Sequence, residues 1–191
     1  IYFVESEVIS PTDGTLYRVS VLGGFVEKVM AGIQARIALS PDNKHFVFVR
    51  RDAPAKRSSL MIGDIGGAGM RELTSIGLDE GTFGYSFDWS PNGEYVAVPV
   101  YFNSGAVGTC ELFAAATKDG TLSQLTNQRW SSVRSVAWTK DSRGLLAVAG
   151  EESEVERPIW HVPFPIGEPR KVLADSSDYS ALSLSPTTPR F

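Results

Sequence analysis

Two histidines, His45 and His161, are the first residues to consider for catalysis in this chain of 191 residues, which has a single cysteine, Cys110. No Gly-x-Ser-x-Gly turn is present to hold a serine nucleophile. We expect neither histidine to have a second histidine, a cysteine or a carboxylate at ligand spacing, and we assign both to structural or surface roles. A single cysteine excludes an intrachain disulfide and a cysteine-rich zinc site. We therefore expect no catalytic residue, no metal and no cofactor in this chain.

Two further segments resemble ligand-binding loops only superficially. Glu151, Glu152, Glu154 and Glu156 supply oxygen ligands of the kind that calcium prefers, but they lack the regular Asp/Asn-Gly spacing of a calcium loop, so we expect a solvated loop. The glycine-rich residues 63–69 lack the Gly-Lys-Ser/Thr ending and the following helix of a phosphate-binding loop. We expect a hairpin turn there.

Short turn-forming sequences recur along the chain and indicate internal repeats. They are residues 40–44, residues 90–94, residues 139–144 and a fourth run that begins at Ser185. Proline presets φ in such turns, and Asn43 or Gly93 is suited to the positive φ that follows. The spacing of about fifty residues is typical of the blades of a β-propeller.

The residues around each turn alternate as they do in β-strands. Apolar side chains stand one and three positions before each turn: Ile37 and Leu39, Phe87 and Trp89, Val136 and Trp138, Leu182 and Leu184. An apolar strand follows each of the first three turns, two more strand-like segments complete each unit, and no stretch has helical periodicity over three turns. We predict an all-β fold, a β-propeller or a portion of one, with about four four-stranded antiparallel blades.

The register divides this single propeller region, residues 1–191, into units. Residues 1–33 lack an innermost strand; complete units follow at 36–82, 86–131 and 134–180; residues 181–191 start or close a blade. The chain is then a portion of a larger propeller, or its last strand completes the first unit within the chain or in a second chain. The end blades would expose apolar faces, which favour a homodimer and, with two chains, an eight-bladed ring.

The same register places four residues at one mouth of the central channel, where the innermost strands begin. They are Arg36, Tyr85, Arg134 and Tyr179. Arginine and tyrosine at a shared mouth suit a peptide or an anionic ligand, and we predict binding there or at the rim loops. Asp88 lies on an innermost strand between two aromatic residues. If it is buried, its carboxylate needs donors such as backbone amides or a hydroxyl of the neighbouring blade.

Composition narrows the classes of partner. The chain has 18 basic and 22 acidic residues, and its net charge of −4 disfavours binding to nucleic acids or anionic membranes. No apolar run approaches the roughly 20 residues that span a bilayer, so we expect no membrane contact by this segment. Apolar residues make up 42% of the chain, which is typical of a globular protein.

Two pairs of segments resemble TolB-type, WD40-like propeller repeats. They are residues 38–49 with 60–74, and residues 88–93 with 112–126. The Gly-His and Trp-Asp dipeptides of true WD repeats are absent. Residues 16–24 look like part of the C-terminal propeller of certain bacterial serine/threonine protein kinases, although this chain has no kinase motif.

The resemblance implies a non-catalytic interaction or sensing module of a larger bacterial protein, with a receptor-type serine/threonine kinase as the preferred parent and an extracytoplasmic or periplasmic location. Two alternatives stay open: the gating propeller of a prolyl-oligopeptidase-like hydrolase, and a TolB-like periplasmic scaffold. Propellers serve many roles, so the repeats specify the fold better than the function.

Overall fold

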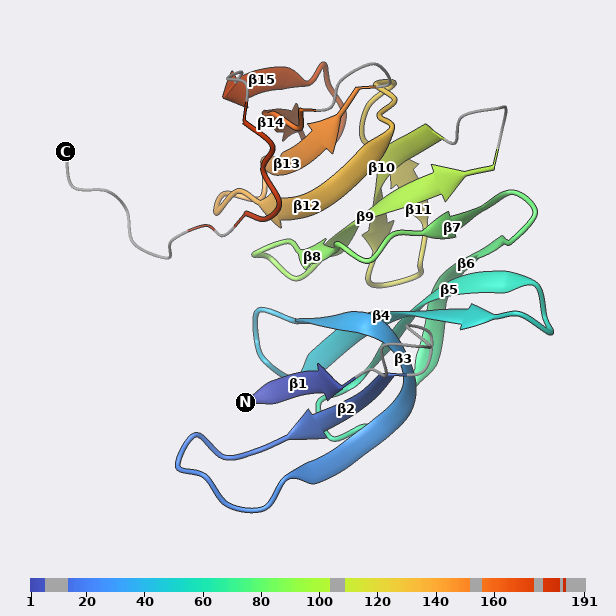
Figure 1. Cartoon of the computed structure of the whole chain (residues 1–191), viewed down its shortest axis with the longest axis vertical. Helices are drawn as coiled ribbons and strands as arrows, with labels where there is room; N and C mark the ends of the chain where they lie inside the picture. The colour runs from blue at the N-terminus through green and yellow to red at the C-terminus, as the bar shows by residue number, and fades with distance from the viewer. Residues whose placement is uncertain (6–13, 104–108, 152–155, 174–176, 183, 185–191) are drawn as a thin grey trace.

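The computed structural model describes residues 1–5, 14–103, 109–151, 156–173, 177–182 and 184 (Figure 1). The regular structure of these residues consists of fifteen β-strands, and every strand pairing within the sheets is antiparallel. The predicted all-β class is therefore confirmed. The described part of the chain contains no helix of the length and apolar character needed to cross a membrane.

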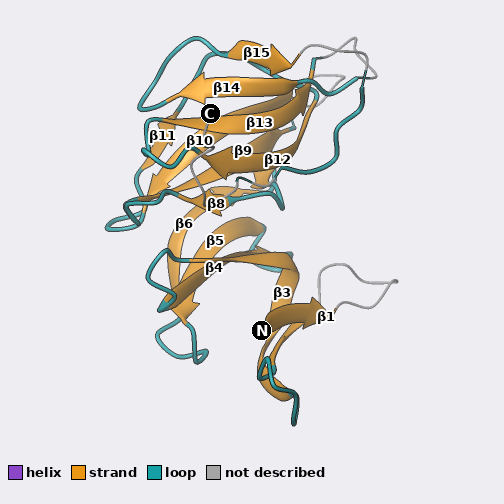
Figure 2. Ribbon diagram, turned by 90° about the vertical axis from the view of Figure 1, so that its left-hand side faces the viewer, coloured by secondary structure: helices purple, strands orange, loops and turns teal. Residues whose placement is uncertain are grey.

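The strands form three sheets. The first contains β1 (Tyr2–Glu5), β2 (Gly14–Arg18), β3 (Glu27–Leu39), β4 (His45–Asp52), β5 (Arg57–Asp64) and β6 (Arg71–Gly77). The second contains β7 (Gly81–Phe83), β8 (Asp88–Trp89), β9 (Tyr95–Phe102), β10 (Thr109–Ala116) and β11 (Leu122–Gln124). The third contains β12 (Ser132–Trp138), β13 (Gly144–Gly150), β14 (Ile159–Pro163) and β15 (Arg170–Leu173). Seen from the side, the sheets follow one another along the long axis (Figure 2).

The boundary expected between residues 33 and 36 is not a break in the structure. β3 is one curved strand of 13 residues (Figure 1); its first part pairs with β2 and its last part with β4. Gly32 adopts a φ of 77° near the point of exchange, a conformation that favours glycine. The outer strand of the first unit thus continues directly into the inner strand of the second.

The boundary expected between residues 82 and 86 also differs. The inner strand of the second sheet is divided into β7 and β8, which both pair with β9, so residues 81–83 belong to this sheet and not to the preceding unit. Four inner residues, 84–87, lie opposite only Val98 and Pro99. Proline has no N–H to donate, which explains why a regular ladder is interrupted there.

The turns that follow the inner strands share one hydrogen-bonding pattern. The first side chain donates to the third: Ser40 Oγ to Asp42 Oδ1 at 2.6 Å, Ser90 Oγ to Asn92 Oδ1 at 2.6 Å, and Thr139 Oγ1 to Asp141 Oδ1 at 2.7 Å. The fourth residue of each turn has positive φ: Asn43 at 56°, Gly93 at 76° and Ser142 at 57°. The predicted turn chemistry is confirmed for Asn43 and Gly93.

Three hydrophobic cores lie between successive units. One packs β1–β3 against β4 and β5 and includes Leu16, Ile33 and Phe46. The second joins β4–β6 to the second sheet, and the third joins the second sheet to β12–β14. Burial of the apolar strand faces therefore occurs between blades, as it does in stacked repeats.

The expected innermost strand at 181–186 is not seen as a strand in the described part of the tail, which comprises residues 181, 182 and 184; residues 183 and 185–191 lie outside the description. The N–H of Leu182 donates to Ser135 Oγ at 3.0 Å, as the N–H of Val136 donates to Ser86 Oγ at 3.0 Å one unit earlier. Leu182 thus occupies the place of the next inner segment. Among the described residues, β1 pairs only with β2.

Candidate functional site

Three of the four predicted channel-mouth residues lie where an inner strand leaves its regular register. Arg36 lies in the irregularity of β3, Tyr85 in the interruption between β7 and β8, and Arg134 in the irregularity of β12. Each irregularity adds residues to the inner strand relative to its partner. Such bulges redirect side chains out of the pleat and are frequent beside binding sites.

Arg36, Tyr85 and Arg134 line one pocket with a volume of about 460 Å³. The other residues around it are Thr82, Phe83, Gly84, Ser86, Tyr101 and Val133. Tyr85 is 44% exposed, and Arg36 is exposed without an ion pair to any other described residue. The pocket therefore presents a free guanidinium and an aromatic ring to solvent.

Tyr101 fixes the wall of this pocket. Its hydroxyl donates to the Val133 carbonyl at 2.9 Å and accepts the Val133 N–H at 3.2 Å, which joins β9 to β12 beside Arg134. A tyrosine is neutral at physiological pH, and burial raises the pKa of Tyr101 further, to about 12. The positive charge of the arginines is consequently not offset by a phenolate.

The second arginine already has an acidic neighbour. Arg134 Nη1 lies 3.6 Å from Asp178 Oδ2, and Asp178 Oδ1 accepts a hydrogen bond from Arg157 Nη1 at 2.7 Å. The hydrogen bond from Arg157 and the charge of Arg134 hold the pKa of Asp178 below its usual value. Tyr179 follows this aspartate, is half-buried and is not among the described residues that line the pocket. The structure thus brings three of the four predicted residues together.

Recognition of an anion is the chemistry that this pocket suits best. A guanidinium binds a carboxylate through two parallel N–H···O bonds, and an exposed tyrosine adds a flat apolar surface and a hydroxyl. Arg36 is available for such a bond, whereas Arg134 would have to share its charge with Asp178. We therefore regard Arg36 as the principal binding residue of the candidate site.

The acidic loop lies partly outside the described residues, which omit 152–155. Glu151 is described; its carboxylate binds Lys171 Nζ at 2.9 Å and accepts a hydrogen bond from Gln128 at 3.3 Å. Within the described ranges, no group of three or more His, Cys, Asp or Glu side chains is arranged to hold a metal ion. Glu151 therefore links the connection between β11 and β12 to β15.

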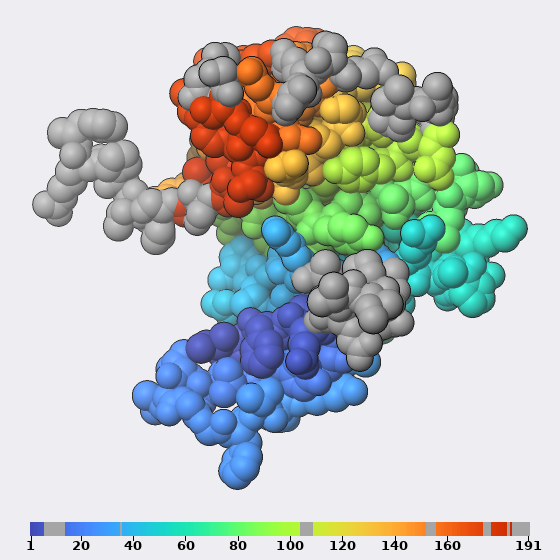
Figure 3. All heavy atoms as spheres, in the orientation of Figure 1, coloured from blue at the N-terminus to red at the C-terminus, as the bar shows by residue number. Residues whose placement is uncertain are grey.

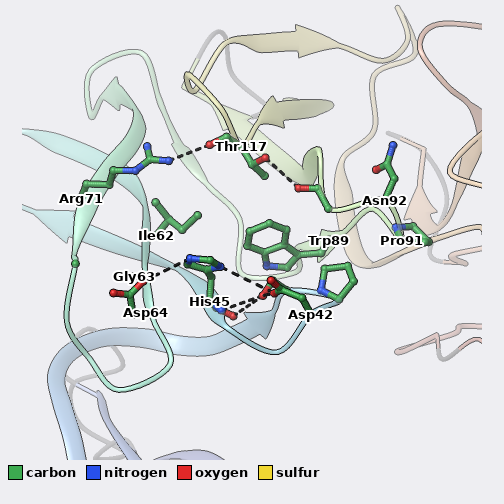
Figure 4. Close-up of a pocket in the computed structure, with 14 residues that line it drawn as sticks. Asp42, His45, Ile62, Gly63, Asp64, Arg71, Trp89, Pro91, Asn92 and Thr117 are labelled. Carbon is green, nitrogen blue, oxygen red and sulfur yellow. Dashed lines mark hydrogen bonds and ion pairs between the residues drawn. The ribbon is translucent and has the colours of Figure 1, made fainter.

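A second pocket, of about 710 Å³, lies at the turn ends of the inner strands (Figure 4). His45 stands between two carboxylates there, with Nε2 at 3.4 Å from Asp64 Oδ1 and Nδ1 at 4.0 Å from Asp42 Oδ1. The expectation that neither histidine has a nearby carboxylate is wrong for His45. The β4–β5 register places Asp64 directly opposite His45, and the turn brings Asp42 back toward it.

The polar groups of this second pocket are largely engaged with one another. Asp42 Oδ1 accepts bonds from Ser40 Oγ and the Lys44 N–H, and Arg71 Nη2 donates to the Thr117 carbonyl at 2.9 Å. The two bonds to Asp42 lie within one turn, whereas the bond from Arg71 joins the start of β6 to the turn that follows β10 in the next blade (Figure 4). Sequence reasoning missed this cluster. The repeat pattern could have revealed the cluster, because equivalent turns of stacked blades lie at the same end of their inner strands.

A backbone amide, one of the donors expected for Asp88, is confirmed as its partner. Its carboxylate accepts the backbone N–H of Trp138 on the neighbouring inner strand at 2.8 Å. Burial raises the pKa of Asp88, and the hydrogen bonds from the Trp138 and Trp89 backbones oppose that rise. The residue therefore joins two blades and does not face the candidate site.

Comparison with solved structures supports the fold. TolB from Acinetobacter baumannii matches with a TM-score of 0.70 and 17% identity over 95% of this chain and 44% of that chain. A TolB described as putative, from Agrobacterium tumefaciens, matches with a TM-score of 0.67 and 13% identity over 89% of this chain and 60% of that chain. The β-propeller domain of the trilobed protease from Pyrococcus furiosus matches with a TM-score of 0.56 and 13% identity over 90% of this chain and 53% of that chain.

These identities are low, so the similarity concerns the fold: an all-β, TolB-like propeller architecture of which this chain represents a part. The chain spans about half the length of each of these three structures. No protein-family model and no curated protein matches the sequence.

Proposed function

We propose that this chain is a non-catalytic, TolB-like propeller module that binds a protein segment, peptide or small ligand through an anionic group. The observation that carries the proposal is the convergence of Arg36, Tyr85 and Arg134, each from a bulged inner strand, on one pocket. Rigid stacked blades hold these side chains, as binding groups on a stable scaffold require.

Binding of a labelled peptide tests this proposal. The probe is a fluorescein-labelled, glutamate-rich peptide measured by fluorescence anisotropy, with the corresponding glutamine peptide as the neutral control. We expect the acidic peptide to bind more tightly, and Arg36→Ala to weaken it by about tenfold, because a charge-assisted hydrogen bond contributes roughly 1.5–3 kcal/mol. Arg134→Ala should have the smaller effect, since Asp178 shares its charge.

Arg143 provides the matched control. It is an exposed arginine in the turn at the opposite end of the inner strand β12, so Arg143→Ala removes the same charge without touching the pocket. Equal affinities of the wild-type chain and the Arg36→Ala/Arg134→Ala double variant would contradict the proposed site. So would equal losses in the double variant and Arg143→Ala.

For the parent protein, we propose a bacterial receptor-type serine/threonine kinase in which this propeller senses a ligand outside the cytoplasm. Two observations support it. Residues 16–24 resemble a segment of the C-terminal propeller of certain bacterial serine/threonine protein kinases, and the fold is similar to that of TolB structures. Sequencing the reading frame on both sides tests it. A kinase domain followed by an apolar span upstream is expected; a downstream Gly-x-Ser-x-Gly elbow would replace it with the hydrolase alternative.

That alternative, a gating propeller of a prolyl-oligopeptidase-like hydrolase, has one specific observation in its favour. The trilobed protease and the tricorn protease contain structures similar to this chain, with TM-scores of 0.56 and 0.57. A TolB-like periplasmic scaffold is the third candidate. It would recognise a folded partner through the rim loops, so Arg36→Ala would leave partner binding unchanged.

A further inference from the structure

Thr117 and Phe164 occupy the same position in successive blades. Each comes directly after the third strand of its unit, Thr117 after β10 and Phe164 after β14. The N–H of Thr117 donates to the Glu94 carbonyl, and the N–H of Phe164 donates to the Arg143 carbonyl, both at 2.9 Å. Both acceptors lie in the turn that precedes the second strand of the same unit. The side chains of Thr117 and Phe164 can therefore be compared directly.

Between the second and third sheets, an aromatic ring occupies this position. The centroid of the Phe164 ring lies 4.8 Å from that of Tyr95 in the preceding unit and 5.0 Å from that of Trp138 in its own unit. Tilted and edge-on arrangements of this kind are favourable for aromatic pairs. Phe164 thus packs between the tryptophan of its own blade and an aromatic residue of the preceding blade.

Between the first and second sheets, the same position leaves space. The hydroxyl of Thr117 lies within hydrogen-bond distance of two carbonyl oxygens of its own turn, at 3.0 and 3.1 Å. His45 stands where the next unit has Tyr95, because the carbonyl of each accepts the first N–H of its turn. Trp89 stands where that unit has Trp138, directly before a turn. The second pocket, of about 710 Å³, is lined by His45, Trp89 and Thr117 (Figure 4), and its volume is in the range of ligand-binding pockets.

Two carboxylates border this pocket. The side chains of Asp42 and Asp64 are 51% and 53% exposed, and neither forms an ion pair with a lysine or arginine within the described part of the chain. Arg71 also lines the pocket, but its guanidinium is directed to the Thr117 carbonyl, to which it donates at 2.9 Å, and away from the two aspartates (Figure 4). The edge of the pocket that Asp42 and Asp64 form therefore suits a cationic group.

We propose that the second pocket binds an aromatic side chain of a partner protein that has a lysine or arginine next to it. The ring takes the place against Trp89 that Phe164 takes against Trp138, and the basic side chain pairs with Asp64 and Asp42. A protein segment is the occupant because the group that fills the equivalent position one blade later is itself a protein side chain. This site lies at the turn ends of the inner strands and selects a cation, whereas the pocket around Arg36 selects an anion.

Titration of the nitrogen-15-labelled chain with short peptides, followed by NMR, tests this site. The probe is acetyl-Gly-Phe-Lys-Gly-amide; replacing its phenylalanine by alanine removes the ring, and replacing its lysine by glutamine removes the charge. We expect a saturable shift of the Trp89 indole N–H with a dissociation constant on the order of 1 mM, as is reasonable for so small a ligand. The alanine peptide should bind about tenfold more weakly, because it buries no ring. The glutamine peptide should bind about threefold more weakly, because an exposed ion pair contributes little.

Two variants of the chain separate the ring from the charge. Thr117→Phe copies the residue of the next blade, so its own ring should fill the pocket and weaken binding of the probe peptide at least about tenfold, with an unchanged circular dichroism spectrum. Asp64→Asn should weaken the lysine peptide about threefold and leave the glutamine peptide unchanged. Asp52→Asn is the matched control, because it removes an exposed carboxylate at the other end of β4, away from the pocket, and should change neither peptide.

The site is refuted if the probe peptide produces no saturable shift, or if a folded Thr117→Phe variant binds it as tightly as the wild-type chain does. Equal effects of Asp64→Asn and Asp52→Asn would also overturn it, and this comparison does not depend on the folding of the Thr117→Phe variant. Phenethylamine, a small aromatic amine, distinguishes the kind of occupant. Binding of phenethylamine as tight as that of the probe peptide would overturn the assignment to a protein partner.

Discussion

Trp138 and Asp88 bind each other twice across two neighbouring blades. The indole Nε1 of Trp138 donates to the Asp88 carbonyl at 3.1 Å, and Asp88 Oδ2 accepts the Trp138 backbone N–H at 2.8 Å. One unit earlier, Trp89 Nε1 donates to the Ala38 carbonyl at 3.1 Å. The tryptophan directly before each of these two turns therefore joins its blade to the preceding one.

Replacing Asp88 should show how much the first pair contributes to stability. Asp88→Ala leaves the Trp138 N–H without its acceptor in a partly buried place, and we expect a loss of about 1–3 kcal/mol in the free energy of unfolding. Asp88→Asn keeps an acceptor oxygen and should lose less. Urea denaturation followed by tryptophan fluorescence measures both; equal losses in the two variants would contradict this role.

A comparison of Gly120 with Gly93 separates two costs of an added side chain, the overlap with a neighbouring blade and the strain of a positive φ. Their φ angles are 77° and 76°, but a Cβ at Gly120 would overlap the Leu73 carbonyl, whereas a Cβ at Gly93 would meet nothing within 4 Å. Gly93→Ala should cost about 1–2 kcal/mol, the strain of a left-handed residue. Gly120→Ala should cost roughly 1–3 kcal/mol more, because the blades must separate. Thermal or urea unfolding checks this; similar losses would refute the overlap.

Asp42 and Asn92 occupy equivalent turn positions, but only the Asp42 side chain can ionise. The Ser40 hydroxyl, and secondly the Lys44 N–H, lower the pKa of Asp42 in the folded chain. Its contribution to stability is therefore present above the unfolded pKa of about 3.9 and is lost as pH falls through the lower folded pKa. Asp42→Asn should reduce the loss of stability on acidification, and Asn92→Asp should increase it.

Unfolding measured at a series of pH values from neutral to strongly acidic checks this pair. Asp141 makes the same bonds in the third turn, so all three proteins should still lose some stability in acid. Parallel stability curves for the wild-type chain and both variants would show that the turn carboxylate is not linked to folding.

Cys110 should be unreactive until the chain unfolds. It is fully buried, and burial raises the pKa of its thiol to about 12, so almost no thiolate exists at neutral pH. Labelling with an aromatic disulfide reagent should follow the unfolding transition in urea. Rapid labelling of the folded chain would indicate that β10 opens locally.

Much of the fold was predictable from short stretches of sequence. The alternation around residues 37–39, 87–89 and 136–138 indicated inner strands, and the Ser-Pro-Asp/Asn turns specified where the chain reverses. These features depend on residues that are neighbours in the sequence. The candidate site was predictable in part, because repeat register placed Arg36, Tyr85 and Arg134 at one end of the strands.

The sequence alone therefore determined the strand pattern, the turns and the order of the units, while the tertiary structure decided how the strands pair and which side chains meet. Four features depend on pairing between segments that are far apart in the sequence. β3 serves two units, and Pro99 divides an inner strand. Tyr179 lies outside the pocket, and Asp64 faces His45. A one-residue change of register moves a side chain to the other face of a sheet, and the register is set by packing across blades, not by local preference.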